Sequence, residues 1–457
     1  MNSIARRFFP RGGDVDMTQG SISRHLIMFA LPLLIGNIFQ QLYNTADTWV
    51  VGNYVSNAAY SAVGSVGPII NMLIGFFTGL ASGAGVIISQ NYGAKCFDKV
   101  KKAVHTSAVM TLGLGVLFTV VGILMTPAML RFMKTPDEVF PEAKSYLTIY
   151  FAGVIGLMIY NMGSGILRAV GDSVKPFFYL VVSAVTNTVL DLLFVLQFHM
   201  GVEGVPYATI IAQGLSALLT VIELLRTKTC IHLSVCDLGL DMPTLGQIFR
   251  FGLPAAIQMS VTSFSNVFVQ SYINYFGADF MSGWTSYSKI DQVVLLPMQS
   301  LALASTTFVG QNLGVHDEPR AKRGVRIAFL MSVISTVLLM LPVMIFARPL
   351  AAFFNAEPAV VTYSAFLLRL ISPFYVLCCV NQVYAGALRG AGDSRMPMII
   401  MLGSFVVFRQ IYLFICSLVC NNIYTIALAY PAGWIVASAI TLLYFHKVGL
   451  HKYKVVD

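Results

Sequence analysis

Long apolar runs fill most of this 457-residue chain, and they constrain its fold more than any other feature. A helix that crosses a bilayer needs about 20 apolar residues. Twelve such runs lie at about 26–54, 60–90, 103–127, 142–166, 177–199, 204–226, 247–276, 281–312, 323–348, 359–388, 397–420 and 424–446. Only 11% of the residues are charged, whereas soluble domains carry about 25%. We therefore predict an integral membrane protein.

The second half of the chain repeats the first. Residues 165–176 read GILRAVGDSVKP and residues 386–397 read GALRGAGDSRMP, so that seven of twelve positions agree at an offset of 221. SQNYG at 89–93 matches GQNLG at 310–314 at the same offset. Self-similarity in a fixed register indicates an internal duplication. Because each half holds an even number of spans, we expect the halves to share one orientation, with a cleft between them.

The predicted fold class is an all-α integral membrane protein, with twelve transmembrane helices in two pseudo-symmetric six-helix bundles (a 6+6 parallel repeat). The predicted domains, in chain order, are a cytoplasmic N-terminal segment at 1–25, an N-lobe with helices one to six at 26–226, a cytoplasmic linker at 227–246, a C-lobe with helices seven to twelve at 247–446, and a cytoplasmic tail at 447–457.

The distribution of basic residues predicts the orientation. Of the 29 lysines and arginines, 22 lie in segments on the side of the N-terminus. Positive charge gathers in cytoplasmic loops, so we expect both termini in the cytoplasm and a multi-pass protein of the cell membrane. The net charge of +9 lies in these short segments, and we therefore expect the lipid bilayer, not nucleic acid, as its surroundings. We expect a monomer.

The repeated stretch is expected to be a tight cytoplasmic turn. Its glycines permit the turn, and Pro176 and Pro397 stand where the next helix begins. Its Arg and Asp side chains could pair with each other or hold neighbouring loops. We interpret this stretch as part of the scaffold.

Polar residues present in only one half are candidates for function. The first predicted helix carries a polar stripe that cannot face lipid cheaply, formed by Asn37, Gln41, Asn44, Asp47 and Thr48. The seventh helix carries Gln258, Thr262, Asn266 and Gln270, with Val269 at the place of Asp47. In the fifth helix Asn187 and Asp191 are four apart and share one face, whereas their counterparts are Phe408 and Tyr412.

Acids inside a membrane are functional sites by default, because a buried carboxylate is costly there. Asp47 and Asp191 are therefore predicted to couple transport to a cation. They could take up and release a proton, or they could bind Na⁺. The expected supporting polar residues, which could instead hydrogen-bond between helices, are Asn187, Asn161, Tyr146 and Thr209. The substrate cleft is expected to include Gln41, Asn44, Gln258, Asn266 and Lys289.

Three charged residues lie in predicted helices of the second half. Lys289 could line the cleft or stand in an ion pair, and Asp291 is two residues away and does not face it on a helix. Arg409 is interpreted as a packing or snorkelling residue. The role of these three residues stays open.

Several motifs of other function classes are absent from the sequence. There is no G-x-x-x-x-G-K-[ST] nucleotide loop, no H-E-x-x-H and no G-x-S-x-G, and the seven cysteines have no disulfide or metal spacing. We therefore expect neither an enzyme nor a cofactor, and the work of transport must come from an ion gradient.

The chain resembles bacterial members of the multidrug and toxic compound extrusion (MATE) family. The resemblance runs from about Ile22 to Lys447, and it is carried by LPLLIGNIFQQLYNTADTWVVG (31–52), SQNYGAK, GILRAVGDSVKP, NTVLDLLFV (187–195), FVGQNLG and GALRGAGDSRMP. It implies two six-helix lobes, alternating access, and export of mostly cationic aromatic compounds against H⁺ or Na⁺. The alternative interpretation is a flippase of related fold for lipid-linked oligosaccharides.

The resemblance also implies site residues. The family's N-lobe acids on helices one and five fall on Asp47 and Asp191, and its supporting polar positions fall on Tyr146, Asn161, Asn187 and Thr209, with Ser164 where a further amide can occur. Another branch places acids in helices seven and ten. Residues 253–276 and 359–388 contain no Asp or Glu, so coupling is expected to rest on the N-lobe.

Overall fold

The computed structural model describes residues 15–55, 57–133 and 135–450, without the side chains of 45–53, 57–61, 64 and 65. The described residues form helices and no strand. The helices of the first half are α2 (Ile22–Tyr54), α3 (Asn57–Gly93), α4 (Phe97–Phe132), α5 (Phe140–Ala152), α6 (Val154–Ala169), α7 (Val174–Leu192) and α8 (Gly204–Arg226). A π-helical segment, Leu193–Gln197, continues α7, and the short 3-10 helices Gly201–Glu203 and Val235–Asp237 lie on either side of α8.

The helices of the second half follow the same order. They are α9 (Met242–Asn274), α10 (Ala278–Gly314), α11 (Glu318–Ile345), α12 (Ala347–Phe354), α13 (Pro358–Ile371), α14 (Tyr375–Gly390), α15 (Arg395–Leu402), α16 (Arg409–Val419), α17 (Ile423–Ala427) and α18 (Ala429–Val448). A 3-10 turn, Ser372–Phe374, separates α13 from α14, and a π-helical segment, Gly403–Phe408, joins α15 to α16.

Each predicted span lies on these helices. Among the described residues, ten helical stretches are long and apolar enough to cross a membrane, or eleven when α5 and α6, bent by 47° at Gly153, count as one. The seventh predicted span coincides with α9 but is not among them, because Gln, Ser, Thr and Asn are spread along it. The chain is a multi-pass, all-α membrane protein, as predicted.

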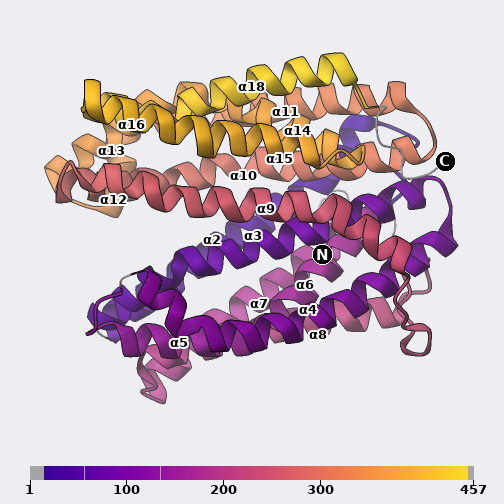
Figure 1. Ribbon diagram of the computed structural model, residues 1–457, viewed down its shortest axis with the longest axis horizontal. Helices are drawn as coiled ribbons and strands as arrows, with labels where there is room; N and C mark the ends of the chain where they lie inside the picture. The colour runs from indigo at the N-terminus through magenta and orange to yellow at the C-terminus, as the bar shows by residue number, and fades with distance from the viewer. Residues whose placement is uncertain (1–14, 56, 134, 451–457) are drawn as a thin grey trace, which may run out of the picture. The chain divides into compact units, whose positions relative to one another are not determined.

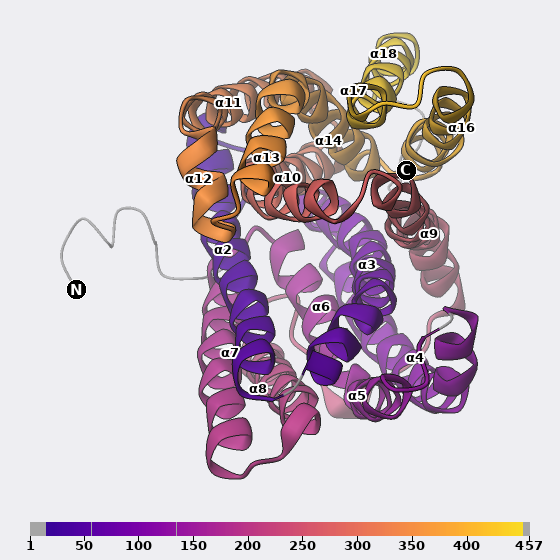
Figure 2. The same ribbon diagram turned by 90° about the vertical axis from the view of Figure 1, so that its left-hand side faces the viewer.

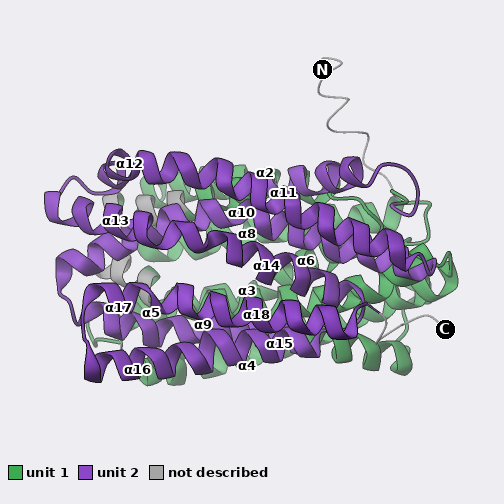
Figure 3. Cartoon of the chain, turned by 90° about the horizontal axis from the view of Figure 1, so that it is seen from above, with its two compact units in different colours: residues 1–16, 35–253 green, residues 17–34, 254–457 purple. Residues whose placement is uncertain are grey.

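The chain forms two compact units, shown in different colours in Figure 3. Unit 1 comprises residues 1–16 and 35–253, and unit 2 comprises residues 17–34 and 254–457. The division passes through α2 and α9 instead of the loops, so each of these helices belongs partly to both units. The predicted domain boundaries, which divide the chain at the linker, remain a prediction.

The two units are built alike. In unit 1, α3 packs against α4, α5 and α6, while α7 packs against α8. In unit 2, the corresponding central helix is α10, which packs against α11, α13 and α14, as Figure 2 shows. Within each unit the long helices run along a common direction (Figure 1). The repeated packing is what the duplication in the sequence predicts.

A repeated glycine explains how closely the central helices pack. A Cβ atom on Gly386 of α14 would lie 2.5 Å from the carbonyl oxygen of Ala302 in α10. The matching Gly165 of α6 lies against Ala81 of α3, where a Cβ atom would be 3.2 Å from the carbonyl oxygen. Small residues let membrane helices approach at such crossings, and a larger side chain would separate them.

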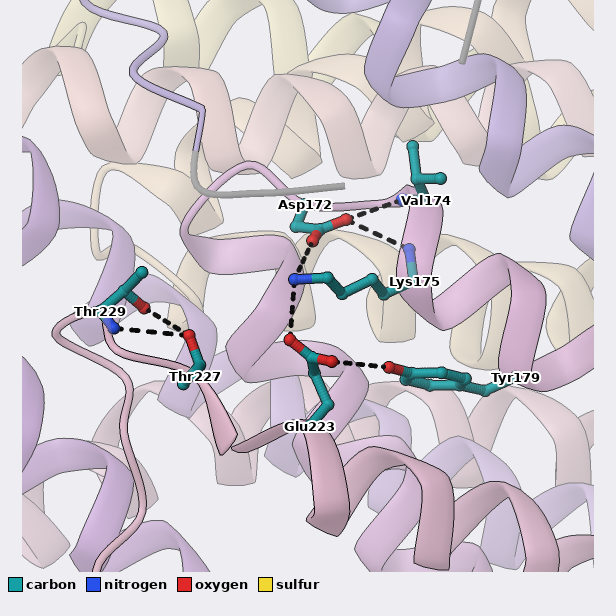
Figure 4. Close-up of polar contacts among 7 residues, drawn as sticks. All are labelled: Asp172, Val174, Lys175, Tyr179, Glu223, Thr227 and Thr229. Atoms are coloured by element: carbon teal, nitrogen blue, oxygen red, sulfur yellow. Dashed lines mark hydrogen bonds and ion pairs between the residues drawn. The ribbon is translucent and has the colours of Figure 1, made fainter. Parts of the chain in front are cut away.

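The repeated GDS stretch forms a tight turn in each unit. In unit 1, Oδ1 of Asp172 accepts hydrogen bonds from the backbone N–H groups of Val174 (3.0 Å) and Lys175 (3.1 Å), and Figure 4 shows this arrangement. Lys175 pairs with the Asp172 carboxylate (3.2 Å) and with Glu223 of α8 (2.8 Å). In unit 2, Asp393 accepts from the N–H of Met396 (3.2 Å) and from the hydroxyl of Tyr444 (2.5 Å). The aspartate thus caps the next helix in both halves.

Candidate functional site

The candidate coupling site in unit 1 centres on Asp191, near the C-terminal end of α7. Its side chain is 0% exposed, and the π-helical segment that follows begins at Leu193. Short π-helical segments within helices often occur at functional sites. The carboxyl group therefore lies inside the bundle and not at its lipid-facing surface.

Two of the expected supporting residues meet one helical turn before Asp191 in the chain. Asn187, one turn earlier on α7, is buried, and its Nδ2 donates to the hydroxyl of Thr209 on α8 at 3.5 Å. Thr209 in turn donates to the backbone carbonyl of Val205 at 2.9 Å. One turn before Asn187 on α7, Ser183 donates to the carbonyl of Ala212 on α8 at 2.8 Å. These bonds hold the polar face of α7 against α8.

The other two supporting residues have different surroundings. Asn161 of α6 donates to the carbonyl of Leu157 at 2.9 Å and accepts from the hydroxyl of Thr78 on α3 at 3.3 Å. Tyr146 of α5 is buried in the apolar core of unit 1. Ser164 of α6 is buried as well. Thr78, which lies at hydrogen-bonding distance from the predicted site residue Asn161, has no feature in the sequence that marks it as part of the site.

The remaining predicted residues are divided between the described and undescribed parts of the chain. The side chain of Asp47 lies outside the described residues. In unit 1, Gln41 is partly buried and Asn44 is exposed. In unit 2, Gln258 is 9% exposed, while Asn266 and Lys289 are exposed. Whether these residues line a common cleft remains a prediction.

The surroundings of Arg409 decide between packing and snorkelling, the two interpretations that the sequence left open. Its side chain is 4% exposed, so it does not snorkel to the membrane surface. The guanidinium donates to the hydroxyl of Ser265 (3.2 Å) and to Oδ1 of Asn266 (2.8 Å), both on α9, and lies 4.8 Å from the ring centre of Tyr430. The physical reason is that polar partners on a neighbouring helix and an aromatic face replace water around the charge.

Unit 2 also contains a polar group around Asp291, a residue whose role the sequence leaves open. Asp291 of α10 accepts hydrogen bonds from the hydroxyls of Tyr287 (3.2 Å) and Tyr375 (2.5 Å). The spacing of four between Tyr287 and Asp291 places them on one helical face, and this part of the cluster could have been recognised in the sequence. Among the described residues, no three His, Cys, Asp or Glu side chains converge as metal ligands.

Comparison with known proteins places this arrangement in a family. The family model described as MatE matches residues 32–193 and 254–415, once in each half. The probable multidrug resistance protein YpnP of Bacillus subtilis (strain 168) is 29% identical over 394 residues, which cover 86% of this chain and 88% of that protein. The FAD transporter of Shewanella oneidensis is 20% identical over 394 residues, covering 84% of this chain and 86% of that protein.

Solved structures show the same fold. An outward-facing multidrug resistance MATE family transporter of the MOP superfamily has a TM-score of 0.90 at 23% identity, covering 96% of this chain and 98% of that chain. A MOP superfamily transporter from Pyrococcus furiosus, whose binding pocket is described as having reverse polarity, has a TM-score of 0.90 at 23% identity, covering 97% and 100%. The resemblance found in the sequence motifs is confirmed, and the chain belongs to the MatE family of membrane transporters.

Proposed function

We propose that this protein is a secondary active antiporter that exports cationic or aromatic drugs and other toxic compounds in exchange for H⁺ or Na⁺ by alternating access. The names of the relatives support the substrate class, since several are multidrug resistance or multidrug export proteins. The transport cycle needs no cofactor in this proposal, and the protein acts as a monomer in the cell membrane with both termini in the cytoplasm.

The observation that carries the proposal is the complete burial of Asp191 in a membrane-spanning helix. A carboxyl group buried inside the membrane costs free energy. Reversible binding of a cation would be the function that explains its presence there. We propose that Asp191 and Asp47 bind the coupling ion, with Asn187, Asn161, Tyr146 and Thr209 as supporting polar groups. The hydrogen bond between Asn187 and Thr209 supports this assignment by linking the helix of Asp191 to α8.

The energy of an ion gradient suffices for useful export. One charge moving through 100 mV gains about 2.3 kcal/mol, and 1.36 kcal/mol corresponds to a tenfold concentration ratio. Each coupled charge therefore supports about a 50-fold substrate gradient.

The test is efflux of ethidium from vesicles that contain the full-length protein, with pH and Na⁺ gradients imposed separately. Asp191→Asn keeps the side-chain volume but cannot ionise, so we expect gradient-driven efflux to fall about tenfold or more, the effect of at least 1.36 kcal/mol. Asp98→Asn, which changes an exposed acid in the first turn of α4, is the matched control and should leave efflux unchanged. Wild-type efflux rates in Asp191→Asn would contradict the site.

A further inference from the structure

Among the described residues of unit 2, Asp291 is the acid that lies in the interior of a membrane-spanning helix. The other acidic residues there, Asp279, Asp317, Glu318, Glu357 and Asp393, lie at helix ends or in loops. The proposed coupling site in unit 1 does not include Asp291. A carboxyl group at this depth is costly unless it has a function, and its surroundings indicate which function.

Two tyrosine hydroxyls from different helices converge on Asp291. Tyr287 lies one turn earlier on α10, and Tyr375 is the first residue of α14. Their side chains are 3% and 0% exposed, and both donate to Oδ1 of Asp291, at 3.2 Å and 2.5 Å. The ionised form of the acid thus receives two hydrogen bonds from donors that are fixed in the core.

Aromatic rings pack against the two tyrosines that hold Asp291. The ring of Trp284 lies 5.2 Å from that of Tyr287 and 5.4 Å from that of Tyr430, between ring centres. Trp434 lies 5.8 Å from Tyr375. These rings surround the site with apolar faces, and one carboxylate with two hydroxyls falls short of the six or more oxygens that hard metal cations such as Ca²⁺ take. A proton is the ligand that fits.

The groups that face Asp291 supply no ion pair. In the described part of the chain, the titratable side chains that interact with it electrostatically include Tyr287 on its own helix, Tyr375 and Cys378 on α14, and Tyr430 on α18. Arg409 of α16 lies over the ring of Tyr430 and donates to α9. No ion pair to Asp291 occurs among the described residues.

The remaining helices packed against α10 add no charge at this place. Arg348 of α12 and Arg369 of α13 are exposed, and Arg369 donates to the carbonyl of Met344. Residues 330–345 of α11 contain no titratable side chain. Lys289 is exposed and stands two residues from Asp291, on another side of α10. A proton can therefore neutralise Asp291 without displacing a cation.

We propose that Asp291 is a second proton-binding site of this transporter, located in unit 2 and held by Tyr287 and Tyr375. The role of Asp291 in coupling rests on the proposed antiport function, whereas the binding of a proton to Asp291 does not depend on it. Proton uptake on Oδ2 leaves Oδ1 as a neutral carbonyl oxygen, which still accepts from both tyrosine hydroxyls but more weakly than the carboxylate does, because hydrogen bonds to an ionised acceptor are stronger. Because Tyr375 belongs to α14, the proton changes a bond between α10 and α14.

Infrared difference spectroscopy of the full-length protein in lipid vesicles tests the site directly. When the pH is lowered from about 8 to about 5, wild type should gain an absorption of protonated carboxyl groups. Asp291→Asn should lose one component of this signal, and its Oδ1 still accepts from both tyrosines. Asp279→Asn, at an exposed position in the first turn of α10, is the matched control and should retain that component.

A second variant distinguishes a proton site from a purely structural acid. Tyr375→Phe removes one donor to the ionised form, so the Asp291 component should appear at higher pH, by about one unit or more, which is a tenfold change in proton affinity. A signal that is identical in wild type and Asp291→Asn overturns the proposal, as does a component that does not respond to Tyr375→Phe.

Failure of the transport proposal can be told apart from failure of this one. If ethidium efflux from vesicles is absent in wild type, the antiport function is wrong, while the infrared component still decides whether Asp291 titrates. If efflux is present, protons moved per ethidium should fall in Asp291→Asn but not in Asp279→Asn. An unchanged ratio would overturn the role in coupling.

Discussion

At the scale of single residues, the repeated GDS stretch shows why particular residue types recur. Gly171 and Gly392 have positive φ angles of +89° and +91°, a conformation that residues with a Cβ atom rarely adopt. A Cβ atom on Gly171 would also lie 2.5 Å from the carbonyl oxygen of Val15. The aspartate that follows caps the next helix. The turn itself was predictable from the sequence, but the partners Glu223 and Tyr444 were not.

The environment of Asp172 makes a prediction about pH. Burial raises the pKa of its carboxyl group, although the N–H groups and the Lys175 ammonium act in the opposite direction. A raised folded-state pKa means that the folded protein binds this proton more tightly than the unfolded chain does. The free energy of unfolding therefore falls as the pH rises from about 3.9, the ordinary pKa of Asp, to the pKa of Asp172 in the folded protein. The charge thus destabilises the fold at neutral pH.

Asp172→Asn should therefore be at least as stable as wild type at neutral pH, because the amide oxygen still accepts both N–H bonds. The difference in stability between Asp172→Asn and wild type should disappear below about pH 3.9, where the carboxyl group is protonated in both the folded and the unfolded state. Asp172→Ala removes the cap and should cost about 1 kcal/mol at neutral pH. Thermal unfolding of the purified protein in detergent, measured across pH, checks this. Equal destabilisation of the Asn and Ala variants at neutral pH would show that the charge itself stabilises the turn.

At the scale of elements, the sequence predicted the spans better than their shapes. The predicted span 142–166 is bent at Gly153, and the span 359–388 is interrupted by a 3-10 turn that contains Pro373. The span 397–420 includes the π-helical segment Gly403–Phe408. Gly and Pro are visible in the sequence as breakers, but whether a helix bends there depends on the neighbours that receive the freed backbone groups.

The linker between the halves is attached to the first turns of α4. The N–H of Ser234 donates to Nε2 of His105 at 3.1 Å, and Nδ1 of His105 donates to the carbonyl of Lys101 at 2.7 Å. The N–H of Asp241 donates to the hydroxyl of Thr106 at 3.2 Å. A half-exposed ion pair joins Lys101 to Asp237 at 2.8 Å, and this hydrogen bond holds the pKa of Asp237 below its ordinary value.

The partly buried hydrogen bond between Ser234 and His105 should stabilise the linker more than the exposed ion pair does. His105→Leu removes the acceptor for Ser234, so amide exchange in the linker should become up to about tenfold faster, as expected from 0.5–1.5 kcal/mol per hydrogen bond. Lys101→Ala should change exchange less, since water and salt screen the attraction in an exposed ion pair. Hydrogen–deuterium exchange of the full-length protein measures both. A larger effect of Lys101→Ala would reverse this ranking.

At the scale of the whole molecule, the predicted orientation can be tested with native cysteines. Cys236 lies in the predicted cytoplasmic linker, and Cys420 lies between α16 and α17, in a loop that the predicted topology places on the other side of the membrane; both are exposed. A membrane-impermeant maleimide added to intact cells should label Cys420 and leave Cys236 unlabelled until the membrane is opened. Cys420→Ser is the control for assignment. Labelling of Cys236 in intact cells would place the linker outside and invert the orientation.

The sequence by itself determined the membrane class, the duplication and the helical spans of this protein, because apolar length and fixed-register repeats are properties of the chain. It also identified Asp191 and Asn187 as one polar face. Only the tertiary structure decided that Asn187 meets Thr209 while Asn161 meets Thr78, and that Tyr375 reaches Asp291 across 84 positions. The rotation of each helix about its axis is set by packing against its neighbours, so contacts between distant helices cannot be derived from the pattern within any one of them.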